Sequence, residues 1–387
     1  MKNPASARKR LITLCIVTVL VGISSGFVGL CLAFLLKAIQ HMAFGYSPLH
    51  IVSHETFLSG VMHASPLRRL LTLSLCGVVV GVGWWALFRY GKPLVSVPKA
   101  IREKLHFPPM STIVHALLQI VTIALGSPLG RESAPREVGA LFAERLAQRA
   151  GLTVRDTKIM IACGSGAGLA AVYNVPLAGT LFVLEVLLAT THWTVVLPTI
   201  TSSTIAVLIS WIGLGNESQY HLGEYEVSNS LILWSACAGP FFGALAFAFS
   251  RMTSSARKAA PKDIRLLIFC LINFIIIGLI VMHSLPAILG NGKSPVQLEF
   301  DDELTIWLSI VLLSMRFLIV WSSLRAGAQG GLLTPSLANG ALFAVVLGGV
   351  WNLFWPGTTF NAYSVIWGYR IPCCSPKNAD YGHCANF

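Results

Sequence analysis

Charged residues are scarce in this chain of 387 residues. Asp, Glu, Lys and Arg together make up 11% of it, whereas hydrophobic residues make up 55% and the mean hydropathy is +0.70. This composition excludes an ordinary soluble domain, in which about a quarter of the residues carry charge. Apolar stretches separated by short polar connections predict an all-α membrane protein that crosses the bilayer several times.

Acidic residues are fewer than basic ones, 16 against 28, which gives a formal net charge of +12. The basic residues fall between the apolar stretches and form no face interleaved with aromatics, so membrane topology explains them and nucleic acid is not an expected partner. Arg8, Lys9 and Arg10 precede a first apolar stretch that is too long for a signal peptide. We therefore expect a retained first helix with a cytoplasmic N-terminus, in the inner membrane if the source is bacterial.

The motifs of common enzyme and metal sites are missing. The chain contains no HExxH or CxxC sequence, and Cys373, Cys374, His383 and Cys384 match no zinc spacing. We expect no metal, no cofactor and no enzymatic activity, although an enzyme embedded in the membrane remains an alternative. Six further cysteines lie in apolar stretches and are expected to be buried small hydrophobic residues: Cys15, Cys31, Cys76, Cys163, Cys237 and Cys270.

Seven stretches are apolar enough to form membrane helices. They are residues 11–36, 70–88, 195–214, 231–249, 266–281, 304–320 and 341–353. Between residues 160 and 190 the apolar character continues but is interrupted by Gly164, Gly166, Gly168, Pro176 and Gly179. This pattern predicts broken or re-entrant helices, which are tolerated inside a protein or along a cavity.

A polar connection near the middle divides the chain into two membrane halves. We place the first half at residues 1–215, the connection at 216–229 and the second half at 230–366. An inverted-repeat transporter has this organisation, with an interrupted element in each half. The sequence offers residues 130–135 and 164–179 in the first half and residues 327–335 in the second.

The stretch Gly130-Arg131-Glu132-Ser133-Ala134-Pro135 places a charged pair after an apolar segment, where charge is costly and is by default a functional hypothesis. A carboxylate among helix N-termini competes with a bound anion for the same positive potential. Glu132 is therefore predicted to be a protonatable gate, with anion occupancy and protonation linked. The plainer alternative is a simple pair between Glu132 and Arg131 at a helix end.

Glycine turns that open a helix leave main-chain N–H groups available to an anion. Gly330, Gly331 and Pro335 fit such a start, with the amides of Leu332 and Leu333 as donors, and Pro98 and Pro135 mark two more. Partial charges from several helix ends suit a conduction path because they hold a small anion without trapping it.

These motifs resemble those of the CLC chloride channels and proton-coupled anion exchangers, over roughly residues 10–366. Residues 130–135 are similar to GREGP, with Ser133-Ala134 in place of one glycine; residues 331–335 resemble GxFxP, and residues 168–179 resemble GLAAAFNAPLAG. The resemblance implies a CLC-like inverted repeat of two helical halves and a homodimer in the lipid bilayer. It implies transport of chloride or other small anions, with Glu132 as the external gate. Anion binding then falls to Ser96, Gly130, Arg131, Gly331, Leu332 and Leu333.

Two departures from the family pattern bear on selectivity and proton coupling. The first anion motif, GSGIP, is matched only loosely by residues 94–98, where Ser96 lies one place beyond the expected serine and Val95 occupies its position. A fluoride-selective exchanger is therefore an alternative. Glu185 matches the first glutamate of the family's Glu-Glu pair, but Val186 stands where the proton-accepting one belongs. Three alternatives follow. Protons pass through another residue, proton movement is only loosely coupled to anion movement, or the protein is a passive channel.

The character of the chain changes abruptly at residues 367–387. If the first base of the Trp367 codon is dropped, the following codons allow a reading that contains LAAAQKMPITAIVLIF. This reading aligns without gaps on residues 169–184, as an inverted repeat requires. We interpret residues 367–387 as the product of a one-nucleotide frameshift. The last two helices are then lost or altered, an inactive polypeptide becomes an alternative to an active transporter, and Tyr363 is not the family's anion-coordinating tyrosine.

Overall fold

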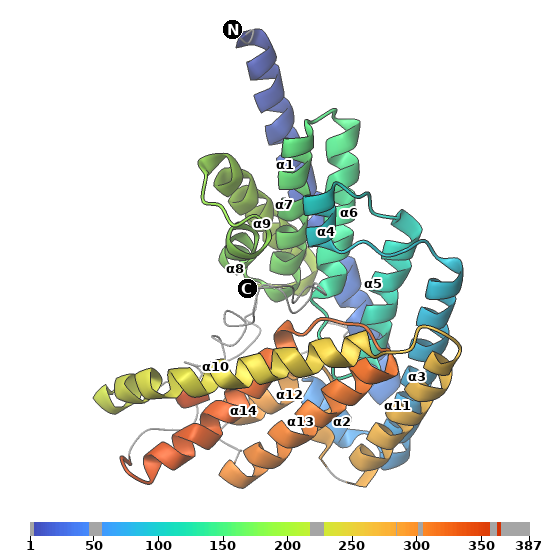
Figure 1. Cartoon of the computed structure of the whole chain (residues 1–387), viewed down its shortest axis with the longest axis vertical. Coiled ribbons are helices and arrows are strands. Elements are labelled where there is room, and N and C mark those ends of the chain that lie inside the picture. Colours follow the sequence, from blue (N-terminus) through green and yellow to red (C-terminus); the bar gives the residue numbers. More distant parts are fainter. Residues whose placement is uncertain are drawn as a thin grey trace. The chain divides into compact units, whose positions relative to one another are not determined.

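The computed structural model describes residues 4–45, 56–216, 228–283, 285–300, 305–356 and 362–364 (Figure 1). Over these residues the chain consists of helices and turns, apart from one isolated bridge between Gly130 and Gly331. Residues 367–387, which we interpret as frameshifted, lie outside the described part.

Over its described residues, each of the seven predicted membrane stretches lies in a helix or within one residue of its end. Within the described residues, seven helices are long and apolar enough to cross a bilayer. They are α1 (Pro4–Phe44), α3 (Pro66–Tyr90), α9 (Trp193–Leu214), α10 (Asn229–Lys258), α11 (Arg265–His283), α13 (Ile306–Ala326) and α14 (Leu333–Asn352). Large apolar side chains remain exposed on their outer faces, as on Phe247 (62%) and Trp307 (74%), and these faces suit contact with lipid. The prediction of a multi-pass helical membrane protein is confirmed.

The interruption predicted between residues 160 and 190 is present. Helix α7 (Val154–Tyr173) ends at Asn174, which adopts a left-handed conformation with φ of 57°. Pro176 has no N–H to continue the helix and disfavours helical geometry in the residue before it, so a new helix, α8 (Pro176–Leu181), begins there. A π-helical turn, η1 (Phe182–Leu187), follows directly.

Several shorter helices connect the long ones. Pro98 lies in the first turn of α4 (Val97–Glu103) and Pro135 in that of α6 (Ser133–Arg149), so both predicted helix starts are confirmed. The others are α2 (Phe57–His63), α5 (Pro109–Ala124), η2 (Pro286–Ile288) and α12 (Lys293–Phe300).

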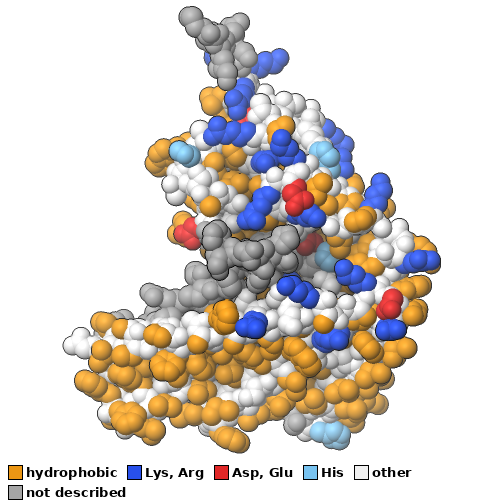
Figure 2. All heavy atoms as spheres, viewed as in Figure 1, with side chains coloured by type: hydrophobic (Ala, Val, Ile, Leu, Met, Phe, Trp, Pro, Cys, Tyr) orange, Lys and Arg blue, Asp and Glu red, His pale blue; other side chains and the backbone are white. Residues whose placement is uncertain are grey.

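The chain forms two compact units whose segments alternate along the sequence. Unit 1 comprises Met1–Leu36, Leu87–Ile120 and Glu132–Gln219, and unit 2 comprises Lys37–Ala86, Val121–Arg131 and Tyr220–Phe387. On the face drawn in Figure 2, Lys and Arg side chains gather over the elements of unit 1, whereas hydrophobic side chains cover most of the surface of unit 2.

Unit 1 is built on close contact between α6 and α7, with α9 against α7. Small residues allow this approach: a Cβ at Gly164 would clash with the Gly139 carbonyl oxygen, and one at Gly168 with the Pro135 carbonyl oxygen. Lipid is as apolar as a protein interior, so the hydrophobic effect does not drive membrane helices together. They pack instead through close van der Waals contact, which small residues allow.

Unit 2 packs α10, α13 and α14 around buried aromatic rings. Tyr363 is fully buried, its ring centroid is 4.5 Å from that of Trp234, and its hydroxyl donates to Asn352 Oδ1 at 2.8 Å. These contacts give Tyr363 a packing role.

The prediction that the cysteines are buried is wrong for half of them. Cys76, Cys163 and Cys270 are buried, but Cys15, Cys31 and Cys237 are exposed on membrane helices. The physical reason is that lipid is itself apolar, so a cysteine on the outer face of such a helix gains little from moving inside.

Candidate functional site

Glu132 is a buried carboxylate at the start of a helix. It is the N-cap residue of α6 and is 1% exposed, and its side chain makes no capping hydrogen bond to the helix. The hydroxyl of Tyr173, the last residue of α7, donates to Glu132 Oε2 at 3.3 Å. A hydrogen bond donated to a carboxylate stabilises its ionised form.

The turn before Glu132 is tied to the turn before α14. Within unit 2, the Gly130 amide donates to the Gly331 carbonyl and the Gly331 amide to the Gly130 carbonyl, both at 2.8 Å. Arg257 Nη2 donates to the Gly330 carbonyl at 2.8 Å and supports the same turn. Because the amide of each glycine donates to the carbonyl of the other, the two glycines shape the turn. The main-chain anion ligands that we propose in this part are the amides of Leu332 and Leu333.

Helix α14 begins where the sequence predicts. Leu332 is its N-cap and Leu333 its first residue, so the amides of both lie at the N-terminus of the helix. The Leu332 carbonyl accepts from the Ser336 amide at 2.9 Å and from the Ser336 hydroxyl at 2.7 Å. These contacts fix the first turn, and the helix dipole places partial positive charge at this end.

Three cations act on one another within unit 2. The side chain of Lys293, at the start of α12, is largely removed from water, and the charges of Arg131 and Lys37 act on it. Burial lowers the pKa of Lys293 to about 8, and repulsion from Arg131 and Lys37 adds to the effect. Lys293 is therefore protonated below about pH 8 and loses its charge above it.

A buried arginine holds the loop that leads to Lys293. Arg316 on α13 is fully buried, and its Nη1 donates to the Ile288 carbonyl at 3.2 Å and to the Gly290 carbonyl at 3.4 Å. The Gly290 amide in turn donates to the Gly126 carbonyl at 3.1 Å. These bonds fix the main chain just before α12.

Ser96 and Glu185 are both exposed. Ser96 is the N-cap of α4 and makes no side-chain capping bond, while Val95, at the family's serine position, packs against a buried cluster that includes Val97 and Phe107. Glu185 lies in the π-helical turn η1 beside Val186, which is 37% exposed. Their roles in anion binding and proton transfer stay predictions.

Sequence reasoning did not single out Tyr173, Lys293 or Arg316. Tyr173 stands where the GLAAAFNAPLAG pattern has phenylalanine, so the extra hydroxyl was visible in the sequence but its partner was not. Lys293 follows Gly290-Asn291-Gly292, and only the fold relates it to Arg131.

Broken helices, a buried glutamate at a helix start and a second start with main-chain donors define a class: multi-pass membrane proteins that carry small anions. The chain belongs to the voltage gated chloride channel family, whose model matches residues 76–368.

Its relatives among characterised proteins include the voltage-gated ClC-type chloride channel ClcB of Citrobacter koseri and that of Escherichia coli. The first is 30% identical over 316 residues, 78% of this chain and 74% of the relative. The second is 30% identical over 347 residues, 85% of this chain and 80% of the relative.

Solved structures show the same fold at low sequence identity. A slow cyanobacterial Cl⁻/H⁺ antiporter is 18% identical, with a TM-score of 0.74 that covers 93% of this chain and 83% of the other. A CLC-type fluoride/proton antiporter, also 18% identical, has a TM-score of 0.66 and covers 95% of this chain and 87% of the other. The CLC-like fold is thereby confirmed.

Proposed function

We propose that this protein transports chloride, and related small anions, across the inner membrane of a bacterium, with Glu132 as the gate. The observation that carries the proposal is the 1% exposed Glu132 carboxylate at the start of α6, directly after a turn bonded to the start of α14. Membership of the family and the names of its relatives support the same function.

The gate works through competition for positive potential. The amides of Leu332 and Leu333 begin α14 and attract an anion, and the charges of Arg131 and Lys293 raise the potential in unit 2. An ionised Glu132 is also stabilised by positive potential, and its negative charge repels a passing anion. Protonation removes its charge, so acid favours the open state.

The test is anion efflux from proteoliposomes that contain the full chain, measured between pH 4.5 and 7.5. We expect wild-type flux to rise as pH falls and the Glu132→Gln flux to be independent of pH, because glutamine is an uncharged isostere. Glu103→Gln is the matched control, since Glu103 is an exposed glutamate on α4 whose carboxylate is 3.9 Å from Lys99. An unchanged pH response in Glu132→Gln would contradict the gating role.

Chloride preference over fluoride belongs to the same proposal. We expect external chloride to compete with labelled chloride efflux and excess fluoride to compete weakly. Fluoride flux that chloride does not inhibit would instead favour a fluoride-selective exchanger. The loose match of the Ser96 region to the family's first anion motif is compatible with that alternative.

We further propose that two copies of the chain associate in the membrane. Helices α8 and α9 present exposed apolar side chains, among them Leu177 (64%), Leu181 (44%) and Leu197 (57%), which a second copy would cover. We expect light scattering of the detergent-purified protein to give a molecular mass twice that of the monomer. A monodisperse monomer would contradict this proposal.

A further inference from the structure

Proton access to Glu132 is a physical problem posed by its burial. Because only 1% of its surface is exposed, a proton that reaches Glu132 from the cytoplasm passes through other groups of the protein. Helix α6, which Glu132 caps, carries two more carboxylates, Glu137 and Glu144. They are seven residues apart, so they lie on the same face of the helix.

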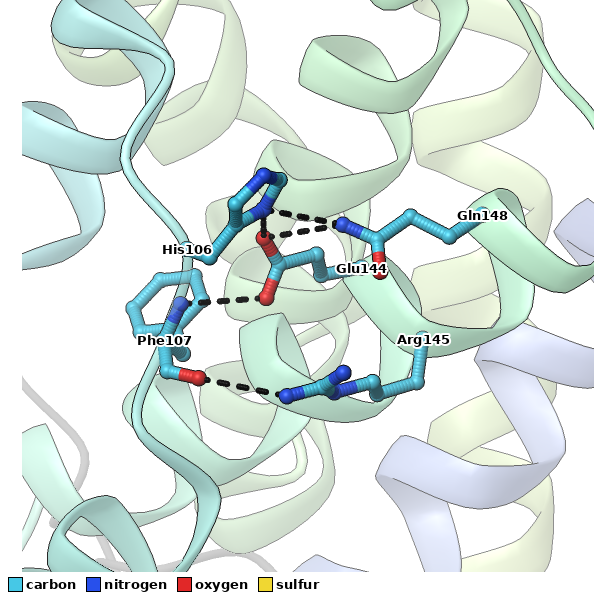
Figure 3. Close-up of polar contacts among 5 residues, drawn as sticks. All are labelled: His106, Phe107, Glu144, Arg145 and Gln148. Atoms are coloured by element: carbon cyan, nitrogen blue, oxygen red, sulfur yellow. Dashed lines mark hydrogen bonds and ion pairs between the residues drawn. The ribbon is translucent and has the colours of Figure 1, made fainter.

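Glu144 forms a compact polar site with the loop that precedes α5 (Figure 3). Its Oε1 is 2.7 Å from His106 Nδ1, and its Oε2 accepts from the Phe107 amide at 3.1 Å. The His106 side chain is 74% exposed whereas that of Glu144 is 2% exposed. An imidazole open to water is thus hydrogen-bonded to an enclosed carboxylate.

The site accommodates a proton on either partner. Gln148 Nε2 lies 3.0 Å from His106 Nδ1 and 3.3 Å from Glu144 Oε1. If Nδ1 holds the proton, it donates to the ionised carboxylate and Gln148 donates to Oε1. If Oε1 holds the proton, it donates to Nδ1, and Gln148 donates to the remaining lone pair of Oε1. Movement of one proton between the two atoms therefore leaves every polar group bonded.

The position of this site in unit 1 indicates that it faces the cytoplasm. Arg10, near the start of α1, pairs with Asp156 in the first turn of α7 at 2.7 Å, which places this end of α7, and the adjoining end of α6, beside the N-terminus of α1. Basic residues are concentrated there: Arg8, Lys9, Arg145, Arg149, Arg155 and Lys158. An excess of basic residues marks the cytoplasmic side. Glu132 caps the opposite end of α6, about 18 Å along the helix axis at 1.5 Å per residue.

Polar groups continue from Glu144 toward Glu132 between α5 and α6. Glu137 Oε2 is 3.7 Å from His115 Nε2 and 3.4 Å from Gln119 Nε2, and both partners are buried on α5. Thr112 lies three residues before His115, is 2% exposed, and its hydroxyl has no hydrogen-bond partner in the described part of the chain. A buried hydroxyl of this kind is a natural place for a bound water.

We propose that these residues, which we call the α5–α6 seam, conduct protons between the cytoplasm and Glu132, and so couple proton movement to anion movement. The seam comprises His106, Thr112, His115, Gln119, Glu137, Glu144 and Gln148. His106 Nε2 accepts a proton from water as Nδ1 releases one to Glu144. The Glu137–His115 pair relays it toward Glu132, and each proton that enters leaves at the other end.

Three further charged side chains on α6 and α4 have partners of their own. Arg145 Nη2 donates to the Phe107 carbonyl at 3.5 Å, and Arg136 lies over the ring of Phe182, 4.4 Å from its centroid. On α4, Lys99 pairs with Glu103.

The inference rests on the proposed function, because it gives the Glu132 gate its proton supply.

The test measures chloride and proton fluxes together in proteoliposomes of the full chain under a chloride gradient. We expect wild-type protein to move both ions and Glu144→Gln to lose at least tenfold in proton flux, with chloride flux kept within about twofold. Glu103→Gln serves as the control. Unchanged proton flux in Glu144→Gln overturns the seam. Chloride flux without any proton flux in the wild type also overturns it and leaves the proposed function standing, whereas absence of chloride flux overturns both.

A second variant guards against misfolding at the buried carboxylate. His106→Asn replaces an exposed side chain, keeps a hydrogen-bonding atom near the position of Nδ1 and removes the titratable ring. We expect proton flux to fall at least tenfold in this variant, with chloride flux kept within about twofold. Wild-type proton flux in His106→Asn would contradict entry through His106.

Discussion

The hydroxyl of Tyr173 distinguishes the surroundings of Glu132 from those that a phenylalanine would give. Tyr173→Phe removes only the donor that bonds Glu132 at 3.3 Å and so favours the protonated carboxyl. A hydrogen bond to a charged group contributes about 1.5 kcal/mol, which corresponds to roughly one pH unit. We expect the midpoint of pH-dependent chloride flux to move about one unit higher in this variant. An unmoved midpoint would show that the hydroxyl does not act on the gate.

Lys293 offers a separate test on the basic side of the transport pH profile. Its pKa of about 8 means that its charge disappears above that pH, so wild-type anion flux should fall there. In Lys293→Met we expect a lower flux below pH 8, by roughly fivefold or about 1 kcal/mol, and no further fall above it. Lys258→Met, at an exposed position near the end of α10, is the control and should match the wild type. The same alkaline fall in both variants would exclude Lys293 as its source.

At the scale of the elements, the contact between α6 and α7 sets the position of Glu132. Gly168→Ala would place a methyl group against the Pro135 carbonyl oxygen and the Arg136 amide, and main chain has little freedom to move away. We expect a loss of about 3 kcal/mol in the free energy of unfolding and a lower thermal midpoint in detergent. Gly243→Ala on α10 is the matched control, because its added Cβ meets no atom and alanine favours the helix. An unaltered thermal midpoint in Gly168→Ala would mean that α6 and α7 move apart to accept the methyl group, and that their close contact is not required for stability.

Hydropathy and Gly/Pro punctuation were sufficient to predict the helices, as the seven spans and the break at Asn174 and Pro176 illustrate. The same reasoning placed Glu132 and Leu333 at helix starts. The burial of individual side chains was harder to predict: Cys31 and Cys163 both lie in apolar stretches, yet only Cys163 is buried. A sequence also does not reveal which polar residues meet across helices, and so the Glu144–His106 and Glu137–His115 contacts had no signal in any motif.

At the scale of the whole molecule, the match to the family ends at residue 368, next to the point where we place the frameshift. We expect the gene, read from codon 367 without the first base, to continue open and to encode an apolar helix similar to residues 169–184. Sequencing the locus from codon 367 onward tests this expectation. Early stop codons in that frame would contradict the frameshift, and the tail would then need an explanation of its own.

The pairing of Gly130 with Gly331 also bears on the order of biosynthesis. Gly331 leaves the ribosome about 200 residues after Gly130, so the turn next to Glu132 has no partner for its two main-chain bonds until most of the chain is synthesised. A pairing so distant in sequence forms slowly, because the intervening chain must first be closed into a loop. The turn at the gate is therefore completed only as the second half of the protein arrives.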